Sequence, residues 1–136
     1  MGERAPKTPA DLLHLLPFAE AIGVELGETS RELVRGTLAW ARERCTTGGV
    51  LHGGALLTLA DTLGGLCAYL NLPPGAATAT IETKTNFIRS VRDGRVEGEA
   101  RPLHVGRSTI VVQTTLVDER GRLVALTTQT QAVVPG

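Results

Sequence analysis

The clearest pattern in the chain is a helical period of apolar residues between Gly53 and Leu70. Apolar side chains recur there every three or four residues, which places them along one stripe of a helix. The stripe consists of Leu56, Leu59, Ala60, Leu63, Leu66, Cys67 and Leu70. Two prolines and a glycine follow in the segment 71–75 and end the pattern. The sequence therefore predicts one long, largely buried helix over 53–70.

A second face of this helix carries small and polar residues, namely Gly54, Thr58, Asp61, Gly64, Gly65 and Ala68. Glycine in a helix interior costs about 1 kcal/mol relative to alanine. We therefore expect Gly64 and Gly65 to allow the close approach of another backbone or of a ligand.

Alternation of apolar and polar residues predicts strands in most of the remaining chain. The predicted strands cover 22–26, 32–40, 78–88, 95–101, 108–117 and 122–134, and residues 27–30 join the first two. The Asp-Gly pair at 93–94 predicts a hairpin between the third and fourth strands. The last four strands are accordingly expected to follow one another as a meander.

The chain begins with a segment, 1–8, that is predicted to be a loose polar arm. Thr8 and Pro9 then begin a short helix, with Thr8 as the N-cap, and this helix is expected to end near Pro17. No linker or repeat divides the chain, so residues 1–136 are predicted to form a single α+β domain. In that domain a curved antiparallel sheet wraps around one long central helix. One helix cannot cover both faces of such a sheet, so pairing with a second copy is expected.

Composition narrows the classes of partner. The 136 residues include 14 basic and 14 acidic side chains, and this balance favours neither a nucleic-acid partner nor a membrane surface. No uninterrupted run of 18 apolar residues is present, which argues against a membrane-spanning helix. Residues 1–10 contain no apolar segment of the signal-peptide type. Cys45 and Cys67 match no metal or redox motif, which favours reduced thiols and a cytoplasmic location. The three histidines are scattered, so no metal site is expected.

The start of the long helix carries the candidate chemistry. The segment 49–54 reads Gly-Val-Leu-His-Gly-Gly and leads directly into the helix. The first helical turn leaves backbone N–H groups unpaired at the positive end of the helix dipole. Gly53 there lets a carbonyl oxygen approach closely, as in an oxyanion hole. Asp61 lies eight residues later on an otherwise apolar helix and is a candidate base or nucleophile. Together they predict acyl-transfer chemistry.

Helix geometry further predicts that this site is shared between two chains. A rise of about 1.5 Å per residue separates Gly53 from Asp61 by about 12 Å along the helix axis. An acyl carbon must lie within about 3–3.5 Å of its attacker while its oxygen reaches the hole. Two antiparallel helices related by a two-fold axis meet both demands, and one helix does not.

These residues resemble the hot-dog-fold thioesterases. More narrowly, they resemble the family of the phenylacetate-degradation thioesterases and the acyl-CoA thioesterase 13-like proteins. The resemblance rests on His52-Gly53-Gly54 with Asp61 nine residues after the histidine. Supporting segments are 85–89, 92–94, 104–107 and 118–125, and the resemblance covers about residues 18–134.

This resemblance implies hydrolysis of an acyl- or aroyl-CoA thioester to the free acid and CoA. No cofactor is implied, because coenzyme A is part of the substrate. Gly53 N–H would polarise the thioester carbonyl, Asp61 would activate water or attack directly, and Thr80 would help to place the water. The family often carries Asn or Gln where this chain has Thr46, whose side chain offers no amide. A homodimer with shared sites, assembled into a tetramer, is also implied.

Several candidates have structural alternatives. His52 either transfers a proton or caps the helix, and Thr80 either serves the site or lies on a solvent-exposed strand edge. Arg89, Arg107 and Ser108 are candidate ligands of the CoA phosphates, because Arg favours multidentate phosphate contacts, but arginines on strands are usually solvated. Gly54 is a further candidate for substrate binding.

Two alternative functions are open at the level of sequence. A non-catalytic acyl-CoA-binding module would use the same pocket, although retention of Asp61 argues against it. Hydratases of the same fold pair a carboxylate with a catalytic histidine, and no Asp-x-x-x-x-His arrangement is present. The roles of Asp61 as nucleophile and as general base need the same carboxylate, so both stay possible.

Overall fold

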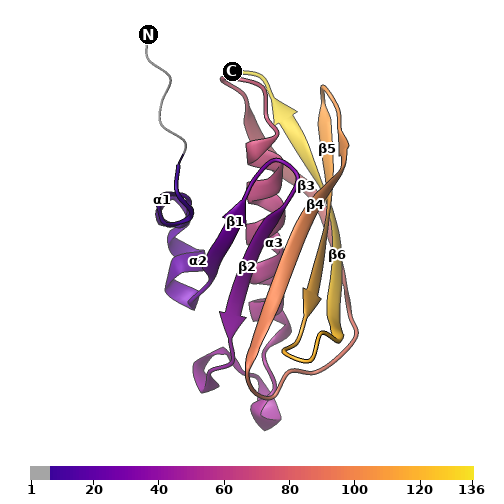
Figure 1. Ribbon diagram of the computed structural model, residues 1–136. Helices are drawn as coiled ribbons and strands as arrows, with labels where there is room; N and C mark the ends of the chain where they lie inside the picture. Colours follow the sequence, from indigo (N-terminus) through magenta and orange to yellow (C-terminus); the bar gives the residue numbers. More distant parts are fainter. Residues whose placement is uncertain (1–6) are drawn as a thin grey trace.

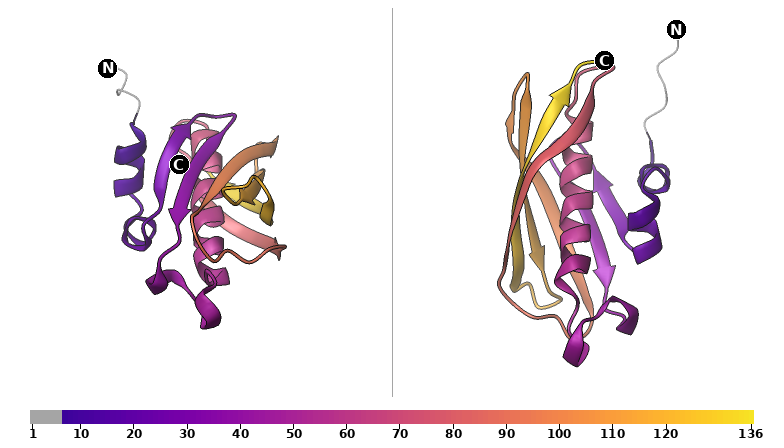
Figure 2. Two further views of the ribbon diagram at one scale, coloured as in Figure 1. Left: turned by 60° about the horizontal axis from the view of Figure 1, so that its bottom comes forward. Right: turned by 180° about the vertical axis from the view of Figure 1, so that it is seen from behind.

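The computed structural model describes residues 7–136 and consists of a curved antiparallel sheet around one long helix, α3 (Figures 1 and 2). The elements in chain order are α1 (Pro9–His14), α2 (Pro17–Ile22), β1 (Glu25–Thr29), β2 (Val34–Ala39), the 3-10 turns η1 (Arg42–Arg44) and η2 (Thr47–Gly49), α3 (Gly53–Leu70), β3 (Ala77–Phe87), β4 (Arg95–Val105), β5 (Thr109–Val117) and β6 (Leu123–Val134). The strand order is β1-β2-β4-β5-β6-β3. The predicted α+β architecture is therefore confirmed.

Helix α3 supplies the centre of the core. Leu59, Leu63 and Cys67 of the predicted stripe are fully buried against the sheet, and burial raises the pKa of the Cys67 thiol to about 11. The helix has 18 residues and a mean hydropathy of 1.3, so by length and composition it meets the criteria for a membrane-spanning helix. Half of it is buried within the protein, and it is the central helix of this fold.

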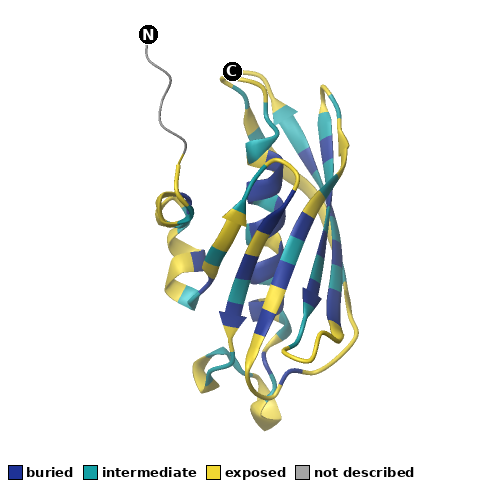
Figure 3. Cartoon of the chain, in the orientation of Figure 1, coloured by how far each residue is buried: buried dark blue, intermediate teal, exposed yellow. Residues whose placement is uncertain are grey.

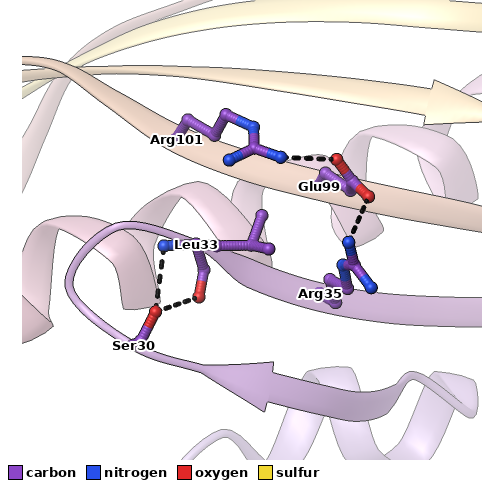
Figure 4. Close-up of polar contacts among 5 residues, drawn as sticks. All are labelled: Ser30, Leu33, Arg35, Glu99 and Arg101. Atoms are coloured by element: carbon purple, nitrogen blue, oxygen red, sulfur yellow. Dashed lines mark hydrogen bonds and ion pairs between the residues drawn. The ribbon is translucent and has the colours of Figure 1, made fainter.

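The face of the sheet that meets α3 is buried and mostly apolar, whereas the outer face carries charged side chains. In β4 and β5 every second residue is buried over most of each strand (Figure 3). On the outer face Glu99 of β4 pairs with Arg35 of β2 at 3.1 Å and with Arg101 at 3.2 Å (Figure 4). Ser30 and Leu33 close the β1–β2 hairpin in the same view. One face therefore packs and the other is solvated.

The first part of the chain differs from the prediction. Thr8 caps α1 through a capping box with Asp11, as expected, but the arm predicted for 1–8 lies mostly outside the described residues. Instead of one helix ending near Pro17, a second short helix starts there, because proline suits a first helical position. The strand predicted at 22–26 was therefore wrong in its start, and β1 runs over Glu25–Thr29, into the predicted connection.

Helix α2 ends at Gly23, which has a left-handed φ of 102°. The Arg44 side chain donates hydrogen bonds to the carbonyls of Ile22 and Ala39, the latter at 2.9 Å. Arg44 fills the space that a Cβ on Gly23 would need. The α1–α2 segment is thereby fixed beside β1 and α3 (Figure 1).

The predicted hairpin between β3 and β4 was also wrong. Gly94 does adopt the positive φ of a turn residue, at 67°. However, β4 pairs with β2 and β5, whereas β3 pairs with β6 at the opposite edge of the sheet. The meander consists of β4, β5 and β6 alone. As a result, β3 is an edge strand of 11 residues.

Candidate active site

The start of α3 presents one free backbone donor. His52 is the N-cap residue, and its ring Nδ1 accepts a hydrogen bond from Gly54 N–H at 2.7 Å. The carbonyl of His52 accepts from Ala55 N–H at 2.9 Å. Within the described residues the N–H of Gly53 makes no hydrogen bond. His52 therefore caps the helix and occupies the N–H of Gly54. The backbone N–H that is left to bind a ligand belongs to Gly53.

Gly53 lies close to the end of β3. A Cβ placed on Gly53 would be 3.4 Å from Cζ of Phe87, whose ring is half exposed. The first residue of α3 and the Phe87 ring at the end of β3 are therefore close neighbours in one chain.

Asp61 is one of the residues that line a cavity of about 620 Å³ between α3, the α1–α2 segment and β3. The carboxylate is exposed in the single chain, and its Oδ1 accepts a hydrogen bond from Nε2 of Gln129 at 3.2 Å. Thr80 lines the same cavity. The structure therefore places Asp61 and Thr80, two of the predicted site residues, around one space.

Gln129 of β6 is a site residue that the sequence analysis missed. Its side chain is 1% exposed and faces inward, and it reaches Asp61 because Gly64 leaves room for it. A Cβ on Gly64 would overlap the amide of Gln129. Two features of the sequence could have indicated this contact: Gly64 in the middle of a helix, and Gln129 at an inward-facing position of a strand. The expected close approach at Gly64 is that of a side chain.

Gln131, two residues further along β6, holds two threonines of β3. Its Nε2 donates to the hydroxyl of Thr80 at 2.8 Å, and its Oε1 accepts from the hydroxyl of Thr78 at 3.1 Å. Since the oxygen of Thr80 accepts from Gln131, its own proton is free to be donated into the cavity.

The two neighbouring glycines of α3 provide a matched test of this packing. Gly64→Ala should lower the free energy of unfolding by about 1–3 kcal/mol, because the methyl group displaces the Gln129 amide. Gly65→Ala should raise it by up to about 1 kcal/mol, since nothing lies within 4 Å of the added methyl and alanine favours the helix. Thermal melts of both variants decide the point, and equal melting temperatures would contradict it.

The other predicted site residues do not converge with these in a single chain. Thr46 is exposed, and its N–H donates to the carbonyl of Val50 at 2.8 Å. Arg89 N–H donates to Val124 O at 3.1 Å, whereas Ser108 O accepts from Val133 N–H at 2.9 Å. These two anchor points on β6 are nine residues apart, or about 30 Å. Arg89 therefore lies far from Ser108 and its neighbour Arg107.

A metal centre finds no support in this part of the molecule. Within residues 7–136, no three His, Cys, Asp or Glu side chains gather into a cluster that could hold a metal ion. The chemistry available at the site is that of a carboxylate, hydroxyl groups and a backbone donor.

Known proteins are similar to this chain in sequence and in structure. A 1,4-dihydroxy-2-naphthoyl-CoA hydrolase of Escherichia coli is 38% identical over 63% of this chain and 63% of its own length. A Vibrio cholerae protein named as an esterase is 44% identical over 62% of this chain and 57% of its own length. The chain thus spans less than two thirds of either relative.

A solved thioesterase structure from Haemophilus influenzae superposes with a TM-score of 0.90 at 27% identity, covering 96% of this chain and 93% of that one. The family model for the thioesterase superfamily matches residues 48–125, which include the start of α3 and Asp61. The predicted class of thioester hydrolase agrees with this match. The chain belongs to the thioesterase superfamily, and its fold is the hot-dog fold.

Proposed function

We propose that the protein hydrolyses acyl- or aroyl-CoA thioesters to the free acid and CoA. Gly53 N–H polarises the thioester carbonyl, and Asp61 is the base or the nucleophile. The observation that carries the proposal is the cavity in which the carboxylate of Asp61 and the hydroxyl of Thr80 meet an apolar wall. The E. coli relative, which is named as an aroyl-CoA hydrolase, supports the same substrate class.

The hydrogen bonds around Thr80 favour a role for this residue in placing water. Gln131 occupies the acceptor side of the hydroxyl, so Thr80 donates its proton to a water in the cavity. A water held in this way can give its own proton to Asp61 and attack the carbonyl carbon. Direct attack by Asp61 would instead break the C–S bond, release CoA as its thiolate and form a mixed anhydride. The same water then hydrolyses the anhydride to the free acid and the Asp61 carboxylate.

The position of β3 supports a site shared by two subunits. Along β3, Phe87 marks the end beside Gly53, whereas Thr80 and Thr83 lie nearer Asp61, opposite Gln131 and Gln129 of β6. An edge strand offers unpaired N–H and C=O groups to a second copy. If two β3 strands pair antiparallel about Thr83, Phe87 of one subunit lies beside Ala79 of the other. Each Gly53 N–H then approaches the Asp61 of its partner.

Charge also favours this register. Pairing about Thr83 puts Glu82 of one β3 opposite Lys84 of the other, and opposite charges at directly facing positions stabilise a strand pair. Both side chains lie on the outer face, away from α3, because Thr83 lies opposite the inward-facing Gln129.

The same arrangement brings the candidate phosphate ligands together. In one chain Arg89 lies far from Arg107 and Ser108. In the antiparallel dimer, Arg89 of one subunit comes to the end of the sheet where the partner's Arg107 lies. We propose these residues as ligands of the CoA phosphates, a tetramer as the assembled form, and the cytoplasm as the location.

The direct test is a hydrolysis assay with the purified protein. Release of free thiol from acetyl-, octanoyl-, phenylacetyl- and hydroxybenzoyl-CoA should reach a kcat of at least about 1 s⁻¹ with one of these thioesters, a usual value for an enzyme on its own substrate class. Binding of the same thioesters without thiol release would instead identify a non-catalytic acyl-CoA-binding module.

A further inference from the structure

The cavity at Asp61 has a chemically uniform inner part formed by the α1–α2 segment and the second half of α3. The apolar residues that line it include Leu12, Leu15, Leu16, Phe18, Leu66 and Tyr69. Leu12 is buried and packs α1 onto the core, so this wall is part of the folded domain.

Most polar groups in the cavity already have partners. The hydroxyl of Thr58 donates to Gly54 O at 2.8 Å, and that of Thr62 donates to Thr58 O at 2.6 Å. Thr78 donates to Gln131 at 3.1 Å. These hydroxyl groups already donate their protons within the protein. The groups best placed to form hydrogen bonds with a ligand are therefore Asp61 and Thr80.

The charge of the lining selects against acidic ligands. Among the described residues that line the cavity, Asp61 carries the only carboxylate, and no Lys, Arg or His is present. The cation Lys7 donates to the hydroxyl of Tyr69 at 3.3 Å and is not one of the lining residues. A ligand carboxylate placed beside Asp61 would face an acidic side chain, and no basic residue of the lining would balance the two.

Two side chains of the wall are unusually exposed for their type. Phe18 is 68% exposed and Leu15 is 56% exposed, and both face the cavity. An apolar group seated there would remove their surface from water, which is favourable in proportion to the area covered. Apolar surface next to a catalytic carboxylate is typical of a ligand pocket.

We infer that the α1–α2 wall is the acyl pocket and that it takes a neutral, apolar acyl group, aliphatic or aromatic. Thioesters whose acyl group carries a free carboxylate, such as succinyl-CoA, are poor substrates. The inference rests on the proposed function and names its substrate class. Phe18 and Leu15 are the specificity-determining residues, and they act on the binding of the acyl group rather than on the bond that breaks.

The test compares kcat/KM for octanoyl-, phenylacetyl-, acetyl- and succinyl-CoA in the wild type and in variants. Octanoyl- and phenylacetyl-CoA should exceed acetyl- and succinyl-CoA by at least about 10-fold. Phe18→Ala should lower the ratio of octanoyl- to acetyl-CoA about 10-fold. Leu103→Ala, which removes a comparably exposed side chain of β4, should leave that ratio unchanged.

A second variant tests the charge argument. Leu15→Lys puts a cation into the wall and should raise the ratio of succinyl- to octanoyl-CoA about 10-fold or more. A wild-type preference for succinyl-CoA, or ratios unchanged by both wall variants, would overturn the inference while leaving thioester hydrolysis intact.

A binding measurement separates failure of the pocket from failure of the proposed function. The octyl thioether of CoA cannot be hydrolysed, and the wild type should bind it about 10-fold more tightly than the ethyl thioether in calorimetry. Phe18→Ala should remove that difference. If both binding results are obtained and no thioester is cleaved, the acyl pocket is supported and the proposed hydrolysis is contradicted. Equal affinities of the wild type for the two thioethers would overturn the acyl pocket itself.

Discussion

Replacing Asp61 with asparagine should lower kcat by about 10²-fold or more without changing the stability of the fold. The amide keeps the shape of the carboxylate, and its oxygen can still accept the hydrogen bond from Gln129. It cannot take a proton from water or attack a carbonyl, because it carries no negative charge. Asp61 is exposed, so the substitution leaves no buried group without a partner.

Steady-state kinetics and a thermal melt of the same preparation provide the measurement. Glu43→Gln is the matched control, since it neutralises an exposed carboxylate on η1, which does not line the cavity. It should retain full activity. Turnover near the wild-type rate in a folded Asp61→Asn protein would assign the chemistry to another group.

Mixing two inactive variants should restore up to about a quarter of the wild-type activity. Gly53→Pro removes the free N–H, and Asp61→Asn removes the carboxylate. In a shared-site dimer each homodimer lacks one half of both sites. A heterodimer holds one intact site of two, and random pairing makes heterodimers about half of the mixture.

The proline variant suits this fold locally. Gly53 is the first helical residue, a position where proline is well tolerated. The preceding His52 has φ −61° and ψ 137°, the extended conformation that a residue before proline adopts. Co-refolding followed by isolation of tagged heterodimers measures the recovery. Folded heterodimers without recovered activity would show that each chain carries its own complete site.

The parts of the molecule that follow a local period were predictable from sequence. The stripe of α3 and the alternation in β4 to β6 both depend on side chains a few residues apart. The cap at His52 depends on the same kind of local signal. Asp61 was predicted on an otherwise apolar helix, but its side chain is exposed in the single chain. These local features were sufficient to predict the fold class.

The parts that depend on distant pairing were not predictable in this way. The turn at Gly94 is real, but a turn does not determine which strands pair, and β3 joins a strand that begins at Leu123. For the same reason Gln129 was missed, because its partner Gly64 is 65 positions away in the chain. Pro17 could either end one helix or begin another, and tertiary contacts with β1 and α3 decide for the second.

The pairing of β3 with β6 determines when the site forms during synthesis. During synthesis α3 and β3 emerge before β4, β5 and β6, and β6 is the only strand bonded to β3 within the described chain. Until β6 emerges, β3 has two open edges and the part of α3 that packs on β6 is uncovered, although β2, β4 and β5 can already cover the rest of the helix. Unpaired strand edges and uncovered apolar surface are the conditions under which nascent chains aggregate. Gln129 and Gln131 are part of β6, so Asp61 and Thr80 acquire their hydrogen-bond partners only after this strand has been synthesised.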